Sequence, residues 1–513
     1  MKRPWISFSI RTFALVVQLF PRGAFACTQT VHDVFDERCG IGTNIMQSLR
    51  PLLSSEAVIT YSSSPNAEAL LARASAPRVS PEYVAIVEVA SESDIQQTVK
   101  YANRHGMPFL AVSGGHGWPS SLNRMKGGIQ INMRKLNTTK LKPDGTTVIV
   151  GGGTLQHEIT ASMFKEHKQV VTGLCGCTSV VGPLLGGGHS MLQYRHGFAA
   201  DNLVSARVVL ADGEVVDVSA ENNPDLFWAL RGAGHNFGIV SAAEIKVYEA
   251  EETWGMSMFI FAENTLEQVF ETWNRVETLH PDPGMLVLNG YITRIEEVDP
   301  KHPLLLLQLF YAEVDNTIVG DFETSFLELN PLSHSITKNI PWGDIFDVGG
   351  MGITSPVCLK NRNLLGSPTS AHQWNPVAMR KGFELLSEIT ADKAFSTSVI
   401  IVESYGSKGI RAVPVSENAV APEEREYHIR LSPILWWTGD DEENTKKAER
   451  FAKDMQSAMR DDKIAPHMYV NYATGHEKME EVYGYDQQRI AKLKTLKKAW
   501  DPHNRFGFYM PIG

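Results

Sequence analysis

The chain has 513 residues, of which 43% are hydrophobic and 21% charged, the proportions of a soluble globular protein. This composition excludes a disordered chain, a collagen and a polytopic membrane protein. The 48 basic and 58 acidic side chains give a formal net charge of −10, which argues against non-specific nucleic-acid binding. The length predicts a large core divided between two domains.

The first 26 residues have the pattern of a secretory signal. A basic start, Met1-Lys2-Arg3, precedes a mostly apolar stretch over residues 5–20 and the small-x-small sequence Ala24-Phe25-Ala26. We therefore predict a signal peptide over residues 1–26 and a secreted or secretory-lumen protein. Arg11 interrupts the apolar stretch, so a buried helix or an uncleaved anchor is the alternative. No later stretch is apolar enough to span a bilayer.

The cysteine count is odd, which leaves at least one thiol outside any disulfide framework. Cys27 and Cys39 are close enough in sequence to favour a local disulfide. Cys175-Gly176-Cys177 could supply half of a metal site, but no second pair follows at ligand spacing, so no metal is predicted. Asn137-Thr138-Thr139 is an acceptor sequence for N-glycosylation in a secreted chain.

From about residue 81 to residue 248, short β-branched runs alternate with glycine clusters. A helix is predicted over residues 91–105, with Ser91 as its cap and apolar residues at helical spacing. Residues 211–213 form a turn between the last two predicted strands. The predicted strands cover residues 83–89, 109–112, 129–133, 147–150, 204–210 and 214–218.

The alternation of β-branched runs and glycine clusters ends near residue 250. The sequence beyond it indicates a second domain, a largely antiparallel sheet carrying helices. A helix is predicted over residues 446–459, where apolar residues share one face. A second helix covers residues 266–276, and the C-terminal tail has a short helix over residues 486–498. The predicted strands of this part are residues 304–311, 397–403 and 427–437.

Three glycine-rich segments concentrate the chemistry: residues 113–117, 173–189 and 228–240. Consecutive glycines let backbone N–H groups converge on a ligand, which is one way to hold a diphosphate. A tight turn without a ligand is the alternative for any one of them.

Other nucleotide and hydrolase motifs are missing. No G-x-x-x-x-G-K-[ST] sequence occurs, which excludes a P-loop. Gly232, Gly234 and Gly238 miss the dinucleotide fingerprint by one position and follow a helical run rather than a strand. No G-x-S-x-G elbow is present either, which disfavours an α/β-hydrolase.

The order and spacing of these segments resemble the vanillyl-alcohol oxidase / p-cresol methylhydroxylase superfamily, and most closely its berberine bridge enzyme-like branch from fungal secondary metabolism. The resemblance rests on Ser113-Gly114-Gly115-His116-Gly117, on the glycines at 186–188, and on the tail sequence Tyr469-Val470-Asn471-Tyr472. It also covers Tyr483-Gly484 and residues 501–506 of the tail, and it is only loose between residues 251 and 465.

The resemblance implies an α+β fold with a two-lobed FAD-binding domain of the p-cresol methylhydroxylase type and an antiparallel-sheet substrate domain with helices on one face. The implied order is an N-terminal extension over residues 27–78, the FAD-binding domain over 79–250 and the substrate domain over 251–465. A tail over 466–513 returns to the flavin domain.

The resemblance also implies FAD as the cofactor, joined covalently to His116 through the flavin 8α-methyl carbon; an uncoupled histidine is the alternative. Cys175 matches the spacing of the cysteine that bicovalent members attach to flavin C6. This second bond stays open, because Cys177 and Val181-Gly182-Pro183 depart from the family pattern. The other implied cofactor contacts are Ser113, Gly114, Gly115, Gly117, Val181, Gly182, Gly187, Gly188, His189, Gly238, Ile239, Val240 and Asn471.

Tyr472 resembles the tyrosine that several members use as a catalytic base, with Tyr469 beside it. A phenol with a pKa near 10 needs a nearby cation or hydrogen-bond donor for that role, and the sequence does not identify one. The alternative is an ordinary aromatic side chain packed under the flavin.

The implied activity is that of a secreted oxidase that passes hydride from a small organic substrate, a secondary-metabolite intermediate, to covalent flavin. Molecular oxygen then reoxidises the flavin and leaves as hydrogen peroxide. The alternatives are a carbohydrate or alcohol oxidase, a flavin-dependent cyclase without net redox turnover, and a non-enzymatic binding protein. A broad aromatic groove would favour a carbohydrate, and a closed apolar pocket a polyketide, alkaloid or terpenoid-like substrate. Trp436 and Trp437 are candidates to line either the groove or the pocket.

Overall fold

The computed structural model describes residues 45–513 except 252, 314–317 and 440–441. The predicted signal peptide and the Cys27–Cys39 pairing lie outside these residues. Within them, no helix combines the length and the apolar character that a membrane span requires.

A four-stranded sheet forms the first lobe of the predicted FAD-binding domain, in the order β1-β2-β4-β3. β2 (Tyr83–Glu88), β4 (Gly128–Asn132) and β3 (Phe109–Val112) are parallel, and β1 (Val58–Tyr61) is antiparallel to β2. Helix α3 (Glu92–Arg104) begins with a capping box in which the side chains of Ser91 and Asp94 each accept a hydrogen bond from the other residue's N–H.

The second lobe is a five-stranded antiparallel sheet in the order β5-β6-β10-β8-β9. The turn between β8 and β9 contains Gly213 at φ +85°, a left-handed conformation that glycine adopts without strain. Its strands are β5 (Thr139–Leu141), β6 (Thr147–Gly151), β10 (Ile239–Lys246), β8 (Leu203–Val209) and β9 (Val215–Ser219). Three short helices, α4 (Gln156–Phe164), α5 (Val181–Leu185) and α7 (Pro224–Ala233), accompany this lobe.

The largest sheet is antiparallel and follows the order β15-β12-β14-β13-β18-β19-β16, with β17 paired to β19. Its strands are β15 (Ser333–Ile340), β12 (Trp254–Phe261), β14 (Leu304–Ala312), β13 (Leu286–Thr293), β18 (Val399–Tyr405), β19 (Ile429–Trp437), β16 (Asn363–Gly366) and β17 (Thr369–Ala371).

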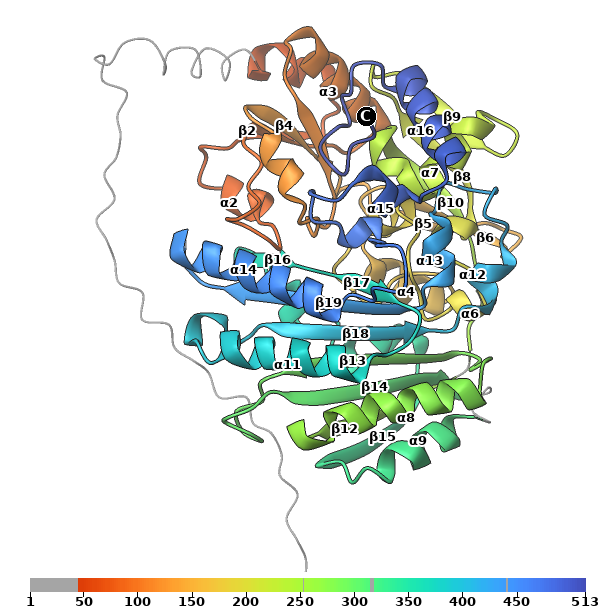
Figure 1. Cartoon of the computed structure of the whole chain (residues 1–513). Helices are drawn as coiled ribbons and strands as arrows, with labels where there is room; N and C mark the ends of the chain where they lie inside the picture. The colour runs from red at the N-terminus through yellow and green to blue at the C-terminus, as the bar shows by residue number, and fades with distance from the viewer. Residues whose placement is uncertain (1–44, 252, 314–317, 440–441) are drawn as a thin grey trace, which may run out of the picture. The chain divides into compact units, whose positions relative to one another are not determined.

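Helices α8 (Leu266–Leu279), α9 (Val319–Leu327), α11 (Pro376–Thr390) and α14 (Glu442–Met459) cover one face of this sheet (Figure 1). Their apolar sides share one core with the sheet, in which Phe270 and Met455 join Val402 and Leu431. The predicted arrangement, an antiparallel sheet with helices on one face, is confirmed, and the opposite face is free to line a site.

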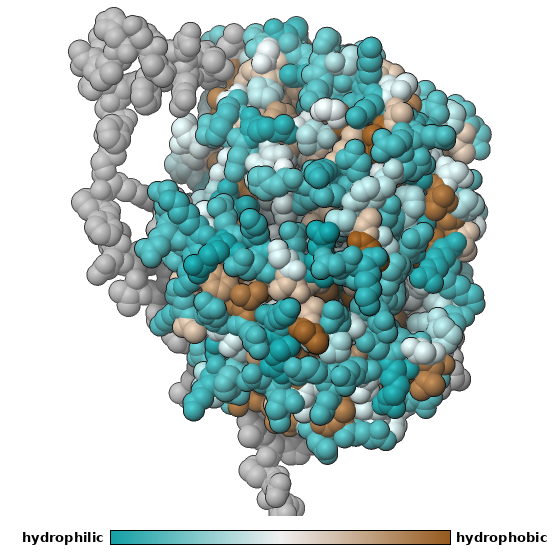
Figure 2. Space-filling model, in the orientation of Figure 1, coloured by the Kyte–Doolittle hydropathy of each residue, from teal (hydrophilic) through white to brown (hydrophobic). Residues whose placement is uncertain are grey.

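The C-terminal tail returns to the FAD-binding region. The Asn236 side chain donates to Tyr483 Oη and Met510 O, and the Lys497 ammonium donates to Asn236 O. The tail contains η10 (Val470–Tyr472), α15 (Met479–Tyr483) and α16 (Gln487–Trp500). The visible surface is mainly hydrophilic, with scattered apolar residues (Figure 2).

Candidate active site

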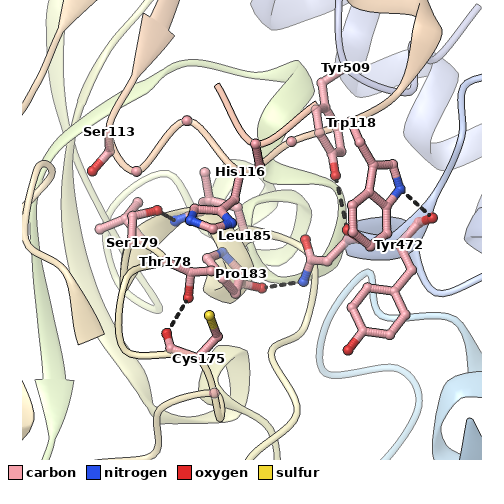
Figure 3. Close-up of a pocket in the computed structure, with 18 of the residues that line it drawn as sticks. Ser113, His116, Trp118, Cys175, Thr178, Ser179, Pro183, Leu185, Tyr472 and Tyr509 are labelled. Carbon is pink, nitrogen blue, oxygen red and sulfur yellow. Dashed lines mark hydrogen bonds between the residues drawn. The ribbon is translucent and has the colours of Figure 1, made fainter. Parts of the chain in front are cut away.

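A cavity of about 430 Å³ opens between the glycine loops, the uncovered face of the large sheet and the tail. This volume is within the range of small-molecule sites, about 300–1,000 Å³. Figure 3 shows its three walls, with Ser113 and His116 on the first loop, Cys175, Thr178 and Pro183 on the second, and Tyr472 and Tyr509 on the tail.

The first wall is the loop over residues 113–117, which directly follows β3. A β-carbon on Gly114 would lie 3.0 Å from Cys177 O, and Gly115 has φ +72°, so both positions favour glycine. Ser113 Oγ and His116 Nε2 are buried and have no hydrogen-bond partner among the described residues. Unpaired buried polar atoms beside a bare backbone fit the diphosphate and ring of FAD.

His116 has the protonation state that attachment to flavin requires. Burial, together with the nearby charges of Lys360 and Arg73, lowers the pKa of His116 to about 4. The imidazole is therefore neutral at physiological pH and keeps a lone pair for attack on an electron-poor carbon.

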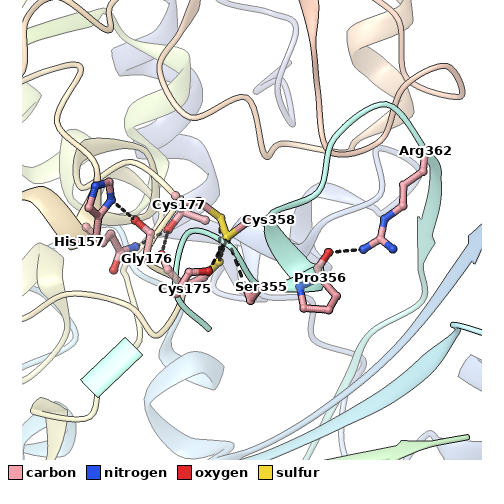
Figure 4. Close-up of a disulfide and its surroundings, with 11 residues drawn as sticks. His157, Cys175, Gly176, Cys177, Ser355, Pro356, Cys358 and Arg362 are labelled. Carbon is pink, nitrogen blue, oxygen red and sulfur yellow. Dashed lines mark hydrogen bonds between the residues drawn. A yellow bond between two sulfur atoms is a disulfide. The ribbon is translucent and has the colours of Figure 1, made fainter. Parts of the chain in front are cut away.

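The second wall carries a free thiol beside a disulfide (Figure 4). Cys177 is bonded to Cys358, which joins the loop before α5 to the segment before β16. Cys175 is free and lines the cavity, with its Sγ 3.4 Å from Cys177 Sγ. Burial raises the pKa of Cys175 to about 11, so it is a thiol at neutral pH. Because two of the three clustered sulfurs are oxidised to a disulfide, they cannot bind metal as thiolates.

The two predicted catalytic tyrosines have different partners. Tyr469 Oη accepts hydrogen bonds from the N–H groups of Gly188 and His189 and from the Asn471 amide, so backbone and tail hold it in place. Tyr472 instead donates to Glu403 Oε2 at 3.2 Å and faces the cavity. Both tyrosines line the cavity, and Tyr472 is the one whose hydroxyl is bonded to a carboxylate.

A tyrosine base needs a nearby cation or hydrogen-bond donor. Among the described residues, the charged group that contacts the Tyr472 hydroxyl is instead the Glu403 carboxylate. Burial and the charge of Glu403 raise the pKa of Tyr472 well above its usual range, so the phenol is protonated at neutral pH. Glu403 is 5% exposed and also accepts a hydrogen bond from Tyr405 Oη. Glu403 is the only carboxylate among the described residues that line the cavity.

The position of Glu403 follows from the register of the large sheet. Glu403 on β18 faces Asn289 on β13 and Arg430 on β19 as cross-strand neighbours, so the three side chains share one face. The next row on that face places Tyr291 beside Ile401 and Ser432. Trp436 lines the cavity on this face, whereas Trp437 is in the core under the helices.

His189 is tied into a buried charged cluster behind the cavity wall. Its Nε2 bonds Glu424 Oε1 at 2.7 Å and Arg430 at 2.9 Å, and Glu424 also bonds His467. Burial opposes ionisation of Glu424, but Arg430 and the two histidines outweigh it and hold its pKa well below the usual range. The His189 ring also packs against the rings of Tyr405 and Tyr469, so this cluster supports both aromatic side chains.

Two of the predicted cofactor contacts lie elsewhere. Gly187 and Gly188 are not part of the cavity lining, because the N–H of Gly188 is bound to Tyr469 and both carbonyls accept from residues 199–200. The predicted residues that line the cavity are Ser113, Gly114, Gly115, His116, Gly117, Cys175, Val181, Gly182, His189, Gly238, Ile239, Val240, Tyr469, Asn471 and Tyr472.

Apart from Trp436, sequence reasoning missed the lining residues that lie outside the glycine segments and the tail. Glu403 had a usable signal, since it is the one charged residue in the apolar strand β18. Arg73 and Tyr291 had none, because each is a single residue far in sequence from the motifs, whereas Trp118 directly follows the loop over residues 113–117.

Residues 83–219 match the family model described as FAD binding domain. The chain is 30% identical over 478 residues to the FAD-linked oxidoreductase anuG of Penicillium roqueforti, covering 91% of this chain and 92% of that protein. It is 33% identical over 436 residues to the FAD-linked oxidoreductase chyH of Penicillium rubens, covering 83% and 85%.

Solved structures share the fold at lower identity. The xylooligosaccharide oxidase of Myceliophthora thermophila C1 gives a TM-score of 0.76 at 22% identity, covering 91% of this chain and 98% of that one. Physcomitrella patens BBE-like 1 gives a TM-score of 0.76 at 18% identity, and the match covers 91% of this chain and 99% of that one. A glucooligosaccharide oxidase of Acremonium strictum, which carries a 6-S-cysteinyl, 8α-N1-histidyl FAD, gives 0.72 at 18%, covering 91% and 99%.

Proposed function

Because the chain belongs to the FAD-linked oxidoreductases, we propose that it is a berberine bridge enzyme-like oxidase of a small, largely apolar organic substrate. The observation that carries this proposal is the pairing of Tyr472 with Glu403 in a cavity that also contains His116 and Cys175. It combines a proton acceptor with two groups that can hold a flavin.

When bound, FAD accepts hydride from the substrate and passes the electrons to an acceptor. The chain's own part is to move the proton. Tyr472 Oη is placed to take a proton from a substrate hydroxyl or C–H while it gives its own proton to Glu403. The raised pKa of Tyr472 disfavours a free phenolate, so the carboxylate is the final acceptor in this relay. Tyr405 shares the carboxylate and orients it.

The lining of the substrate side supports an apolar or aromatic substrate. Trp118, Tyr291 and Val357 pack against an apolar cluster that contains Leu364, Ile434 and Trp436. A substrate with one reactive hydroxyl on an apolar frame would bury its frame here and present the hydroxyl to Tyr472. Assay of a panel of hydroxylated aromatic and terpenoid compounds against xylobiose and similar sugars tests this; turnover of sugars alone would overturn it.

A carbohydrate oxidase is the second candidate. Three of the similar solved structures are named oligosaccharide oxidases, and tryptophans such as Trp118 can stack on sugar rings. A flavin-dependent cyclase shares the same cavity, and hydrogen peroxide released in step with product formation distinguishes an oxidase from it.

We further propose covalent attachment at both His116 and Cys175. The neutral imidazole supports the first bond, and the engagement of Cys177 by Cys358 supports the second, since it leaves Cys175 as the free thiol at the cavity. The masses of flavin-bearing peptides test both bonds. A flavin bound only to the peptide containing His116 would leave the enzyme monocovalent.

Secretion is proposed on the N-terminal pattern together with the disulfide, because disulfides persist in oxidising compartments. Asn137 is exposed and therefore accessible for glycosylation. Recovery of the protein from culture medium, with a mass shift removed by an N-glycosidase, tests both points; retention inside the cell would contradict secretion.

A further inference from the structure

Arg73 is a buried cation at the cavity, in the segment between α2 (Ala67–Leu71) and β2. The residue is 6% exposed. Its Nη2 donates to Gly117 O at 2.9 Å, and its Nε has no partner among the described residues. Arg73 therefore lies directly on the first glycine loop with unused donor capacity.

No carboxylate neutralises this guanidinium. In the part of the chain that the structure describes, Arg73 forms no ion pair, and the acidic groups that face it are the phenols of Tyr83 and Tyr509. Both phenols have raised pKa values because they are buried, so they are uncharged at neutral pH. A buried charge without a counter-ion is strongly unfavourable, which indicates that an anion completes the site.

A second cation lies near the same loop. Lys360 is exposed, and its Nζ lies 3.6 Å from the position of a β-carbon on Gly115. Backbone hydrogen bonds tie the two segments together: Ala74 N, next to Arg73, donates to Gly115 O of the loop at 3.1 Å, and Asn361 N, next to Lys360, donates to Arg73 O at 2.8 Å. Like Arg73, Lys360 has no ion-pair partner within the described ranges.

We propose that Arg73 and Lys360 form a two-cation site for the diphosphate of FAD, acting with the backbone N–H groups of residues 113–117. The diphosphate is a dianion, so two cations complete its charge balance, and the guanidinium fork suits phosphate oxygens. This inference rests on the proposed role of the loop in holding the diphosphate. It assigns a cofactor-binding role to the segment before β2 and to the large-sheet region, outside the sequence motifs.

The test measures affinity instead of turnover. In a His116→Ala/Cys175→Ala background, which cannot form covalent links, the Kd values for FAD and for riboflavin are measured by flavin fluorescence. Riboflavin has the same ring but no phosphate. We expect Arg73→Gln to weaken FAD binding about tenfold to a hundredfold and riboflavin binding less than twofold. Arg73→Lys should recover part of the loss.

Lys360→Gln should weaken FAD binding about two- to fivefold, with a larger effect at low salt, because this cation is exposed. The matched control is Lys126→Gln, another exposed lysine, which is paired with Glu82 and should change neither Kd. Equal loss of FAD and riboflavin in Arg73→Gln, or unchanged FAD affinity in both variants, would overturn the two-cation site. Failure of the parent protein to bind FAD at all would instead overturn the proposed function.

Discussion

The two sides of the cavity are encoded differently in the chain. The cofactor side is built from contiguous segments, residues 113–117 and 173–185, where glycine leaves the backbone exposed to the cavity. The substrate side is built from single residues on three strands, such as Asn289, Glu403 and Trp436, which share a face only because of the sheet register. A sequence motif can therefore identify the cofactor, whereas the reaction partner of Tyr472 depends on the tertiary fold.

The largest expected effect lies on the cofactor side. His116→Ala should abolish the 8α bond, so that the flavin that survives acid precipitation is attached through Cys175 alone. His116→Ala/Cys175→Ala should release all of it. The exposed His476→Ala serves as control and should keep its acid-stable flavin. Acid-stable flavin at the wild-type level in the double variant would break the assignment of this side.

On the substrate side, Glu403→Gln should lower kcat about 10²- to 10⁴-fold, because the amide cannot accept the proton that Tyr472 delivers. Flavin content and melting temperature should remain close to wild type. Glu277→Gln is the matched control, since Glu277 bonds the neighbouring Ser404 on the opposite face of the sheet. Tyr472→Phe combined with Glu403→Gln should cost no more than either change alone, as expected for one relay. Additive losses would contradict it.

A smaller effect separates the two adjacent tryptophans. Trp436→Ala should raise KM about three- to tenfold through lost aromatic contact with the substrate. Trp437→Phe, in the core under the helices, should lower the melting temperature and leave KM unchanged. If only Trp437→Phe raised KM, the assignment of Trp436 to the cavity face and Trp437 to the core would be wrong.

The smallest expected effect is that of pH on the rate of covalent flavin attachment. With a pKa of about 4, His116 remains a neutral nucleophile well below pH 6, so the rate of covalent flavin attachment to the cofactor-free protein should change less than twofold between pH 8 and about 5.5. An imidazole with the ordinary pKa near 6.5 would lose about tenfold over that range. Such a loss, measured by acid-stable absorbance over time, would mean that His116 is not held neutral.

Much of the fold could be predicted from the sequence where local patterns decide it. The strand at residues 109–112 and the cap at Ser91 agree with the structure, because turn and capping chemistry is local. Strands β12, β13 and β15 were missed, since pairing at long range determines them. The Cys177–Cys358 disulfide was missed for the same reason: its two residues are 181 positions apart.

Because of that disulfide, the choice of expression host determines whether Cys177 and Cys358 are oxidised. In a reducing cytosol Cys177 and Cys358 would be thiols beside Cys175, in a cluster whose three sulfur atoms lie within 4.8 Å of one another when the disulfide is present. Three competing nucleophiles would then be presented to the cofactor, and the segment before β16 would lose its tether. One gene would give two distinct preparations, which differ in their flavin linkage and in whether the segment before β16 is tethered to the loop before α5.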